Sequence, residues 1–257
     1  MKLKQIKIAL VALAATTFFA SCNSDNNDTT PTAEVKKEVS LSTSATLGSY
    51  LSDKDGRSLY YFSTDANGQA SCTGGCEAVW PAFVVDNLTA DKIGTGLTFS
   101  DFATITTASG KKQVTYKGWP LYYYAPSVSG TNTAEAAGKT TGDGVGGVWF
   151  IAKPDYSIMI VRSQLVGHDT KNYKSDYTVG DGLTTYFTDA KGITLYTFKN
   201  DNFKKNNFTK ADFSNNAIWP IYETDKIVVP SVLDKSKFSV ITVCGKSQLV
   251  FTGWALY

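Results

Sequence analysis

Apolar and polar residues alternate in short runs along most of the chain, and this alternation predicts β-strands. Residues 50–62 read YLSDKDGRSLYYF, and residues 102–116 read FATITTASGKKQVTY. In each run, aromatic and β-branched residues flank an Asp-Gly or Ser-Gly pair, which is typical of a β-hairpin. No long stretch has the 3.6-residue apolar period of an amphipathic helix, so we expect only short helical turns, for instance at residues 209–216 before a Trp-Pro pair.

The pattern repeats, which indicates an all-β protein with two tandem copies of a small antiparallel β module, sandwich-like or barrel-like. The matching segments are residues 50–65 and 186–201, residues 78–81 and 217–220, and residues 111–122 and 246–257. We assign residues 46–153 to module 1, residues 154–177 to an inter-module connection and residues 178–257 to module 2. A Leu-Tyr pair recurs within each module, so the smallest repeating unit is about half a module.

The two modules differ after their shared Gly-Trp-x-Leu-Tyr. Module 1 continues through TTGDGVGGVWFIA at residues 140–152, and module 2 shows no counterpart after GWALY at residues 253–257. Strands without a partner leave a sheet edge that proteins normally cover or charge. We therefore expect module 2 to be truncated at its C-terminus, with its last segment at a sheet edge and a full product that continues past Tyr257.

The N-terminus is typical of a bacterial lipoprotein. A lysine-bearing start is followed by an apolar run too short to span a bilayer and by FASC at residues 19–22. We expect residues 1–21 to be a signal peptide and Cys22 to carry the lipid. Residues 22–45 are mostly polar and contain no aromatic residue, so they are expected to form a flexible tether. Asp25 and Asp28 resemble export signals of surface lipoproteins, which favours the outer membrane, on its periplasmic or surface face.

Removal of the signal peptide changes the charge of the chain. The formal charge of +2 loses Lys2, Lys4 and Lys7 and no acidic residue, so the mature protein has a formal charge of −1. No basic patch remains that would bind nucleic acid. The expected partners are the membrane, through the lipid, and a glycan or a protein of the envelope.

Several motifs together give a family resemblance. Y-x-F-x-x-D occurs at residues 60–65 and 196–201, with the variant YYYAPS at residues 122–127. With C-x-x-x-C-x-x-x-W-P at residues 72–81 and GVGGVW at residues 144–149, the chain resembles the bacterial secreted repeat of unknown function, a family of lipoproteins. The resemblance implies a lipid-anchored or secreted repeat protein, and it implies no reaction.

The cysteines indicate a structural disulfide. Cys72 and Cys76 are separated by three residues, including two glycines, in a chain exported to an oxidising compartment. The alternatives are a redox pair, which normally has two intervening residues, and a metal site, which needs further ligands such as histidine. The histidine of this sequence, His168, lies outside both modules. Module 2 has no cysteine in the matching loop, and Cys244 is expected to be a buried free thiol.

The aromatic residues and the motif aspartates each have two interpretations. The aromatic side chains either fill the cores of the modules, which their recurrence favours, or stack on sugar rings, and strand alternation places Tyr61 outward. The aspartates either cap turns, or serve as acid and base with Asp53 or Asp143, or bind calcium, although residues 65–68 lack the other ligands of a calcium loop. The candidate ligand-binding residues are Tyr61, Asp65, Trp80, Trp119, Tyr123, Asp201 and Trp219.

No catalytic signature accompanies these residues. The sequence has no nucleophile elbow or phosphate loop, and GDGVGG at residues 142–147 precedes a strand and not a helix. We expect no catalytic residue, no metal and no cofactor. The favoured function is a non-enzymatic scaffold or binding module of the cell envelope. The alternatives are a surface enzyme that acts on glycans through paired aspartates, and a redox protein that uses Cys72 and Cys76.

Overall fold

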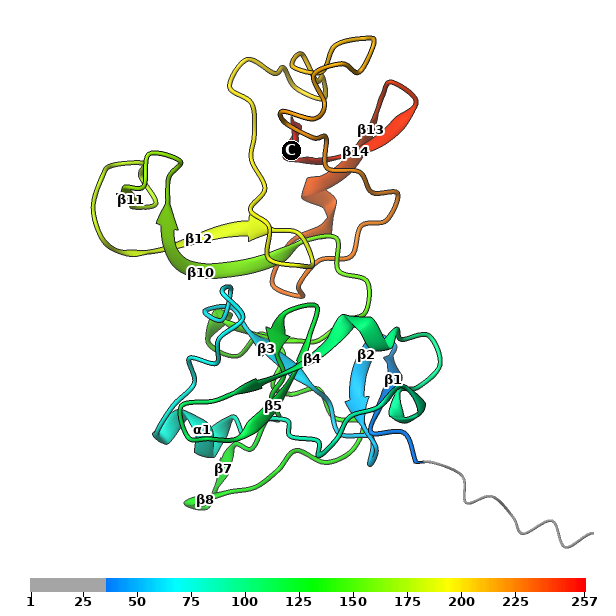
Figure 1. Ribbon diagram of the computed structural model, residues 1–257, viewed down its shortest axis with the longest axis vertical. Helices are drawn as coiled ribbons and strands as arrows, with labels where there is room; N and C mark the ends of the chain where they lie inside the picture. The colour runs from blue at the N-terminus through cyan, green and yellow to red at the C-terminus, as the bar shows by residue number, and fades with distance from the viewer. Residues whose placement is uncertain (1–35) are drawn as a thin grey trace, which may run out of the picture. The chain divides into compact units, whose positions relative to one another are not determined.

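Antiparallel strand pairing organises residues 36–257, which are the residues that the computed structural model describes (Figure 1). The strands are β1 Val39–Ser44, β2 Gly48–Asp53, β3 Tyr60–Phe62, β4 Phe102–Thr106, β5 Lys112–Tyr116, β6 Trp119–Pro120, β7 Ser127–Val128, β8 Thr131–Asn132, β9 Trp149–Ile151, β10 Met159–Val166, β11 Asn172–Tyr173, β12 Leu183–Thr188, β13 Phe238–Val243, β14 Lys246–Phe251 and β15 Trp254–Ala255. A short helix, α1, spans Gly75–Val79, and single 3₁₀ turns lie at Ala90–Lys92, Phe99–Asp101, Val145–Gly147 and Lys235–Lys237. The predicted signal peptide, residues 1–21, and the predicted lipid-carrying Cys22 lie outside the described residues. No helix within residues 36–257 is long and apolar enough to cross a membrane.

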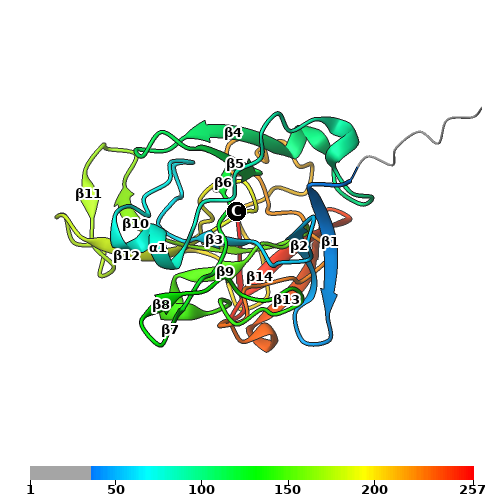
Figure 2. The same ribbon diagram turned by 90° about the horizontal axis from the view of Figure 1, so that it is seen from below.

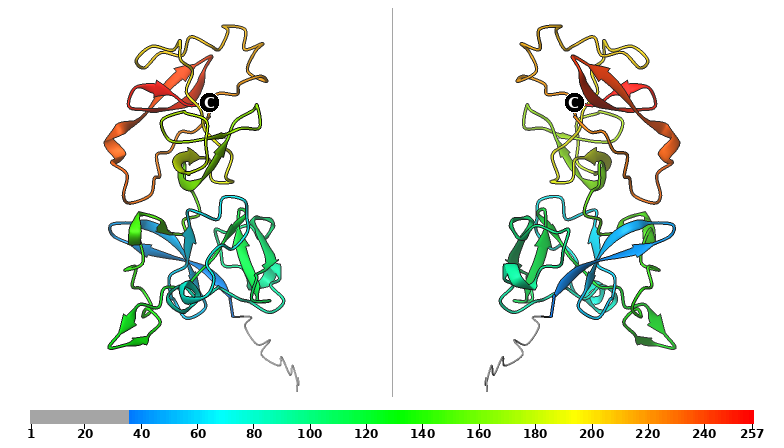
Figure 3. Two further views of the ribbon diagram at one scale, coloured as in Figure 1. Left: turned by 90° about the vertical axis from the view of Figure 1, so that its left-hand side faces the viewer. Right: turned by 90° about the vertical axis from the view of Figure 1, so that its right-hand side faces the viewer.

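The strands form sheets of only two or three members, and the all-β prediction is confirmed. The sheets are β1–β2, β3–β9, β4–β5–β6, β7–β8, β11–β10–β12 and β13–β14–β15. Figure 2 shows β1 beside β2 and β7 beside β8, and Figure 3 shows the β7–β8 hairpin projecting from module 1. α1 lies before the first Trp-Pro pair as expected, whereas residues 209–216 contain turns and no helix.

The sequence repeat is a structural repeat. β4–β5–β6 of module 1 corresponds to β13–β14–β15 of module 2, with Phe102 opposite Tyr116 and Phe238 opposite Phe251. The turn that leads into β6 and the turn that leads into β15 both contain a non-glycine residue and a glycine at positive φ. Two consecutive residues at positive φ fit the twist of a tight hairpin, which explains why Lys-Gly and Thr-Gly stand at these turns.

Three strands lie in segments for which the sequence predicted none. The predicted tether, residues 22–45, includes β1, which pairs with β2 and buries Val39 completely. The tether prediction is therefore wrong for residues 39–44, because this segment gains backbone partners and core contacts from β2. β10 and β11 lie within the predicted inter-module connection, residues 154–177, and β10 pairs with β12 as β1 pairs with β2.

Aromatic side chains fill the interior of module 1. Trp149 stacks on Trp80 and on Phe62 at ring-centroid distances of 3.9 and 4.0 Å, with interplanar angles of 4° in both pairs. Tyr61 is buried and not outward-facing as expected, because Phe150 and Trp119 cover that side of β3 at centroid distances of 5.4 and 5.1 Å. Both faces of this strand are therefore interior.

The structure contains the expected disulfide between Cys72 and Cys76, which links the start of α1 to the loop before it. In module 2 the position aligned with Cys72 is Phe208, whose ring contacts Phe198 at a centroid distance of 5.1 Å. In module 2 an aromatic contact thus lies where module 1 has the disulfide. Cys244 is free, but it is exposed and not buried as expected, because it lies at positive φ in the turn between β13 and β14.

Replacing Cys72 with Ser should lower the stability of module 1 by about 2 kcal/mol, because the bridge closes a short loop in the unfolded chain. The module is expected to remain folded, since module 2 forms without this bridge. Thermal unfolding of the variant, with a Cys244→Ser control that leaves the melting temperature unchanged, checks the first point. Non-reducing peptide mapping checks the pairing, and a bridge from Cys244 to either partner would contradict it.

Candidate functional site

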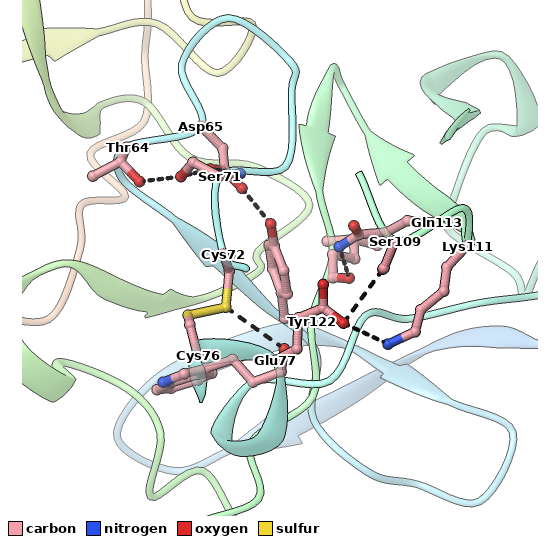
Figure 4. The surroundings of a disulfide bond; sticks show 12 residues. Thr64, Asp65, Ser71, Cys72, Cys76, Glu77, Ser109, Lys111, Gln113 and Tyr122 are labelled. Carbon is pink, nitrogen blue, oxygen red and sulfur yellow. Dashed lines mark hydrogen bonds and ion pairs between the residues drawn. A yellow bond between two sulfur atoms is a disulfide. The ribbon is translucent and has the colours of Figure 1, made fainter. Parts of the chain in front are cut away.

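A buried carboxylate connects two of the sequence motifs in module 1 (Figure 4). Asp65 follows β3, and one oxygen of its side chain accepts hydrogen bonds from the backbone N–H and the hydroxyl of Ser71, at 2.9 and 2.5 Å. The other oxygen accepts a hydrogen bond from the hydroxyl of Tyr122 at 2.6 Å. Asp65 is fully buried, so these donors replace the water that its carboxylate would otherwise bind. The aspartate of Y-x-F-x-x-D therefore caps a turn and also fixes the tyrosine of Gly-Trp-Pro-Leu-Tyr.

The same arrangement recurs in module 2. Asp201 accepts a hydrogen bond from the backbone N–H of Asn207 at 2.7 Å and from the hydroxyl of Tyr257 at 2.8 Å. In both modules the tyrosine also exchanges two backbone hydrogen bonds of 2.9 Å with the first residue of the motif, which is Tyr60 in module 1 and Tyr196 in module 2. We call this arrangement of carboxylate, turn amide and tyrosine hydroxyl the carboxylate–tyrosine lock.

A third lock uses a residue that the sequence analysis did not identify. The motif variant at residues 122–127 has Ser127 in place of aspartate, and Glu135 takes over as the acceptor. The hydroxyl of Tyr60 donates to one oxygen of Glu135 at 2.6 Å, and the N–H and hydroxyl of Thr141 donate to the other oxygen. The available signal is the spacing, because the carboxylate lies six residues before the turn donor in all three locks, as Asp65 does before Ser71.

Burial keeps the tyrosine hydroxyls of the locks protonated. It raises the pKa of Tyr122, with a further contribution from the charge of Asp65, and it raises the pKa of Tyr257, with a contribution from Asp201. Burial also raises the pKa of Asp65 above its ordinary value of 3.8, although the hydrogen bonds from Ser71 and Tyr122 oppose this rise. The hydroxyls therefore act as hydrogen-bond donors across the physiological pH range.

The other aspartates considered for catalysis are also bound to neighbouring groups. Asp53 accepts hydrogen bonds from the side chain of Arg57 at 2.7 and 2.9 Å and from the hydroxyl of Tyr123 at 2.9 Å. Asp143 accepts one from the backbone N–H of Ile151 at 2.8 Å. These contacts give both carboxylates structural hydrogen-bond partners. Within residues 36–257, no group of three or more His, Cys, Asp or Glu side chains is arranged to hold a metal ion.

The structure does not bring the candidate ligand-binding residues together on one open face. Tyr61, Asp65, Trp80, Trp119 and Asp201 are buried. Tyr123 is half-buried, with the guanidinium of Arg57 at 4.5 Å from its ring centre. These side chains fill the cores of their modules, and Trp219 remains as the candidate that borders open space.

Trp219 lines a cavity of about 540 Å³ on module 2, which we call the aromatic groove. The lining residues are 165–168, Asp189, 193–196, 218–222 and Tyr257. Tyr196 has 51% of its surface exposed here, whereas its module 1 counterpart Tyr60 is 0% exposed. Ile218, next to Trp219, is 74% exposed. The sequence analysis missed Tyr196 and Ile218, because equivalent positions in a repeat were expected to have equivalent burial.

Comparison with known protein families gives a match in module 1. A family described as a secreted repeat of unknown function matches residues 42–84 and 103–153. These segments match two copies of that repeat, and the family expected from the motifs is confirmed for them. Each copy is about half of module 1, as the recurring Leu-Tyr pair indicated. No curated protein and no solved structure gives a significant match to the chain.

Replacing Asp65 with Asn should lower the free energy of unfolding by about 1 kcal/mol, because an amide cannot accept hydrogen bonds from Ser71 and Tyr122 on both of its ends. The size of the loss is expected to depend on pH. Since the pKa of Asp65 is raised, the folded protein binds its proton more tightly than the unfolded chain, so the stability that Asp65 contributes falls as pH rises through the folded pKa. The loss in the variant should therefore be larger at about pH 4 than at about pH 7.

Urea unfolding of wild type and variant at the two pH values measures this difference. Asp212→Asn is the matched control, because Asp212 is an exposed turn aspartate whose pKa is lowered by hydrogen bonds from Ser214. Its contribution to stability is present at neutral pH and lost as pH falls, so the control should show the opposite trend. A loss in Asp65→Asn that grows with pH would contradict the buried-carboxylate account.

Proposed function

We propose that this protein is a lipid-anchored, non-enzymatic binding module of the bacterial cell envelope and that the aromatic groove is its binding surface. The observation that carries the proposal is the difference between the two modules at equivalent positions. Tyr196 and Ile218 are exposed in module 2, whereas Tyr60 is completely buried in module 1. Exposed aromatic and aliphatic side chains around a concave surface are the common features of a ligand site.

The state of the carboxylates supports a non-enzymatic function. The carboxylates of Asp65 and Asp201 accept hydrogen bonds from turn donors and from tyrosine hydroxyls. Asp53 is held by Arg57. A glycan-active enzyme with paired aspartates would need at least one of these carboxylates to reach a substrate, and the contacts favour a structural role instead. A redox role is disfavoured because Cys72 is buried and an aromatic contact takes the place of the bridge in module 2.

The N-terminal sequence supports the anchoring part of the proposal. Cys22 stands directly after the apolar run in the context FASC, and the matched family is a family of lipoproteins. The polar segment after Cys22 would separate the modules from the bilayer, and β1 is the first strand among the described residues. The acidic residues that follow Cys22 favour the outer membrane, where the groove would meet proteins or glycans of the envelope.

Replacing Cys22 with Ala should release the mature protein from the membrane fraction or leave it as an unprocessed precursor, because the thiol that would carry the lipid is removed. Cell fractionation with intact-mass measurement of both forms checks this expectation. A variant that is still processed, acylated and membrane-bound would rule out anchoring through Cys22. Cys244→Ala is the matched control, since this exposed thiol lies far from the N-terminal sequence and its loss should not change the fractionation.

A photo-crosslinking amino acid at position 218 should give an adduct with an envelope component in intact cells, because this side chain is exposed at the groove. The matched control is position 128 on the projecting β7–β8 hairpin, where Val128 is 58% exposed and does not line the aromatic groove. Adducts at position 218 should disappear when Tyr196 is replaced by Ala. Equal labelling at both positions, or none at position 218, would remove the groove as the binding surface. Turnover of an envelope glycan that Asp65→Asn abolishes without lowering the melting temperature would instead favour the enzyme.

A further inference from the structure

A cavity of about 590 Å³ lies where module 1 meets module 2, and it shares no residue with the aromatic groove. Three segments line it: the turn between β1 and β2, the chain between β9 and β10, and the loop between β12 and β13. Each of these segments joins two described strands, so its ends are held by strand pairing. We call this cavity the junction pocket, and its lining residues are 46–49, Lys153, Asp155, 227–231, Leu233 and Lys235.

Hydrogen bonds at the junction fix the segments around the pocket. The backbone N–H of Ser157 donates to the carbonyl of Val228 at 2.8 Å, and the hydroxyl of Ser157 donates to the carbonyl of Lys226 at 2.7 Å. Between the modules, the N–H of Arg162 donates to the carbonyl of Ser63 at 2.9 Å. The walls of the pocket therefore consist of chain with defined partners.

A pair of lysines gives the pocket its charge. Lys153 is half-buried, and its Nζ lies 5.4 Å from the centre of the Tyr156 ring, a cation–π contact that holds the ammonium group in place. Lys235 begins the 3₁₀ turn that leads into β13. Neither lysine forms an ion pair with an acidic residue of the described chain. Together with Asp155, the two lysines give the lining a formal charge of +1.

The surroundings of Lys153 favour a bound anion. Burial lowers the pKa of Lys153 below its ordinary value of 10.5, the charges of Asp143 and Asp155 oppose this shift, and the charge of Lys235 adds to it. A cation that loses water through burial and is repelled by a second cation is stabilised by a negative charge placed between the two. An anion in the junction pocket would supply this charge.

Comparison of the two modules shows that the fold does not require a lysine at position 235. When Phe238 of β13 is aligned with Phe102 of β4, Lys235 aligns with Phe99. Leu233 aligns with Leu97 and, like it, packs against a core cluster of its module. The repeat thus keeps the leucine that the core needs and has a cation where module 1 has an aromatic ring. A charge that neither packing nor an acidic neighbour explains indicates a ligand.

The remaining wall of the pocket is aliphatic. The apolar lining residues are Leu47, Ile227, Val228, Val229, Pro230 and Leu233. None of the described residues that line the pocket is aromatic, so a sugar ring or a base would find no stacking face there. A flexible hydrocarbon chain needs only apolar surface that it can cover, because the hydrophobic effect is non-directional. The wall therefore selects for an aliphatic ligand.

We propose that the junction pocket binds an aliphatic anion, that is, a carboxylate or phosphate group attached to an alkyl or acyl chain. The head group would lie between the ammonium groups of Lys153 and Lys235, with the hydroxyls of Ser49 and Ser231 as further donors, and the chain would cover the aliphatic wall. Fatty acids and phospholipids both have this chemistry, so the ligand would be a lipid component of the envelope. This site is independent of the function proposed for the aromatic groove.

Titration calorimetry of the mature full chain with decanoate and with decyl phosphate, below their micellar concentrations, tests the proposal. Each should bind saturably with one ligand per chain. Lys153→Met and Lys235→Met should each weaken binding by about tenfold, because each removes one of the two charges and keeps an apolar stem. Lys191→Met is the matched control, since Lys191 is exposed and does not line the pocket, and it should leave the affinity unchanged.

Two further probes separate the head group from the chain. Decyltrimethylammonium has the same chain with a positive head group and should not bind, and inorganic phosphate lacks the chain and should bind at least tenfold more weakly than decyl phosphate. If decyltrimethylammonium binds as tightly as decanoate, or inorganic phosphate as tightly as decyl phosphate, the inference is wrong.

NMR titration of the lysine side chains gives a second, independent readout. Bound decanoate should raise the pKa of Lys153, because a neighbouring negative charge favours the ammonium form. The resonance is assigned by its loss in Lys153→Met, and the melting temperatures of the variants separate a loss of binding from a loss of folding. Saturable binding that leaves the pKa of Lys153 unchanged would overturn the placement of the head group.

The remaining comparisons identify the source of the ligand and the location of binding. Tighter binding of dihexanoyl phosphatidic acid than of decanoate would support a phospholipid, and the reverse order would support a free fatty acid. Tyr196→Ala, in the aromatic groove, should change neither affinity. If this variant weakens binding and the two lysine variants do not, the aliphatic anion occupies the groove and the inference is wrong. If neither decanoate, decyl phosphate nor the phosphatidic acid binds, the inference is also wrong.

Discussion

The hydrogen bond from a tyrosine hydroxyl to a buried carboxylate is the interaction on which the rest of the structure depends. Asp65 and Tyr122 are 57 residues apart in sequence, and their contact brings the two copies of the repeat together at 2.6 Å. Removing one partner of this bond leaves the other buried without a hydrogen-bond partner, which costs about 1–3 kcal/mol. Separation of the two copies would therefore break this hydrogen bond, which stabilises the paired arrangement.

The lock also explains the composition of the family motif. The first tyrosine of Y-x-F-x-x-D donates its hydroxyl to a carboxylate of the other copy. The aspartate accepts a hydrogen bond from the tyrosine hydroxyl of the other copy. Where the second copy has Ser127 in place of aspartate, Glu135 restores the acceptor from a different place in the loop. The physical requirement is a carboxylate at this point in space, and the sequence can meet it from more than one position. The spacing of Y-x-F-x-x-D misses this substitution, whereas the six-residue spacing between carboxylate and turn donor keeps it.

Much of the fold follows from local sequence, and the parts that do not follow depend on distant contacts. Alternation and turn residues predicted the hairpin of β4 and β5 and the turn-capping role of Asp65. They did not predict β1, because a polar segment with only Val39 and Leu41 as apolar residues becomes a strand only when β2 pairs with it. Tyr61 was expected to face outward, since nothing in its own strand reveals that Phe150 covers it.

The candidate site shows the same division. The sequence identified Trp219 but not the groove around it. The exposure of the groove residues depends on which chain segments pack over each copy of the repeat. Neither the residues of that copy nor its secondary structure indicates this packing. Exposure at Tyr196 and burial at Tyr60 differ although both positions carry the same residue in the same motif. Burial here is a property of the pair of copies and not of the single copy.

Pairing of the two copies in module 1, through the locks and through β3 and β9, has a consequence for how such proteins can lengthen. A duplication that adds one copy adds a unit with no neighbour to pair with its strands or to cover its sheet edge. A duplication that adds a pair adds a self-sufficient body. In module 1 the self-sufficient unit is therefore the pair of copies and not the single repeat.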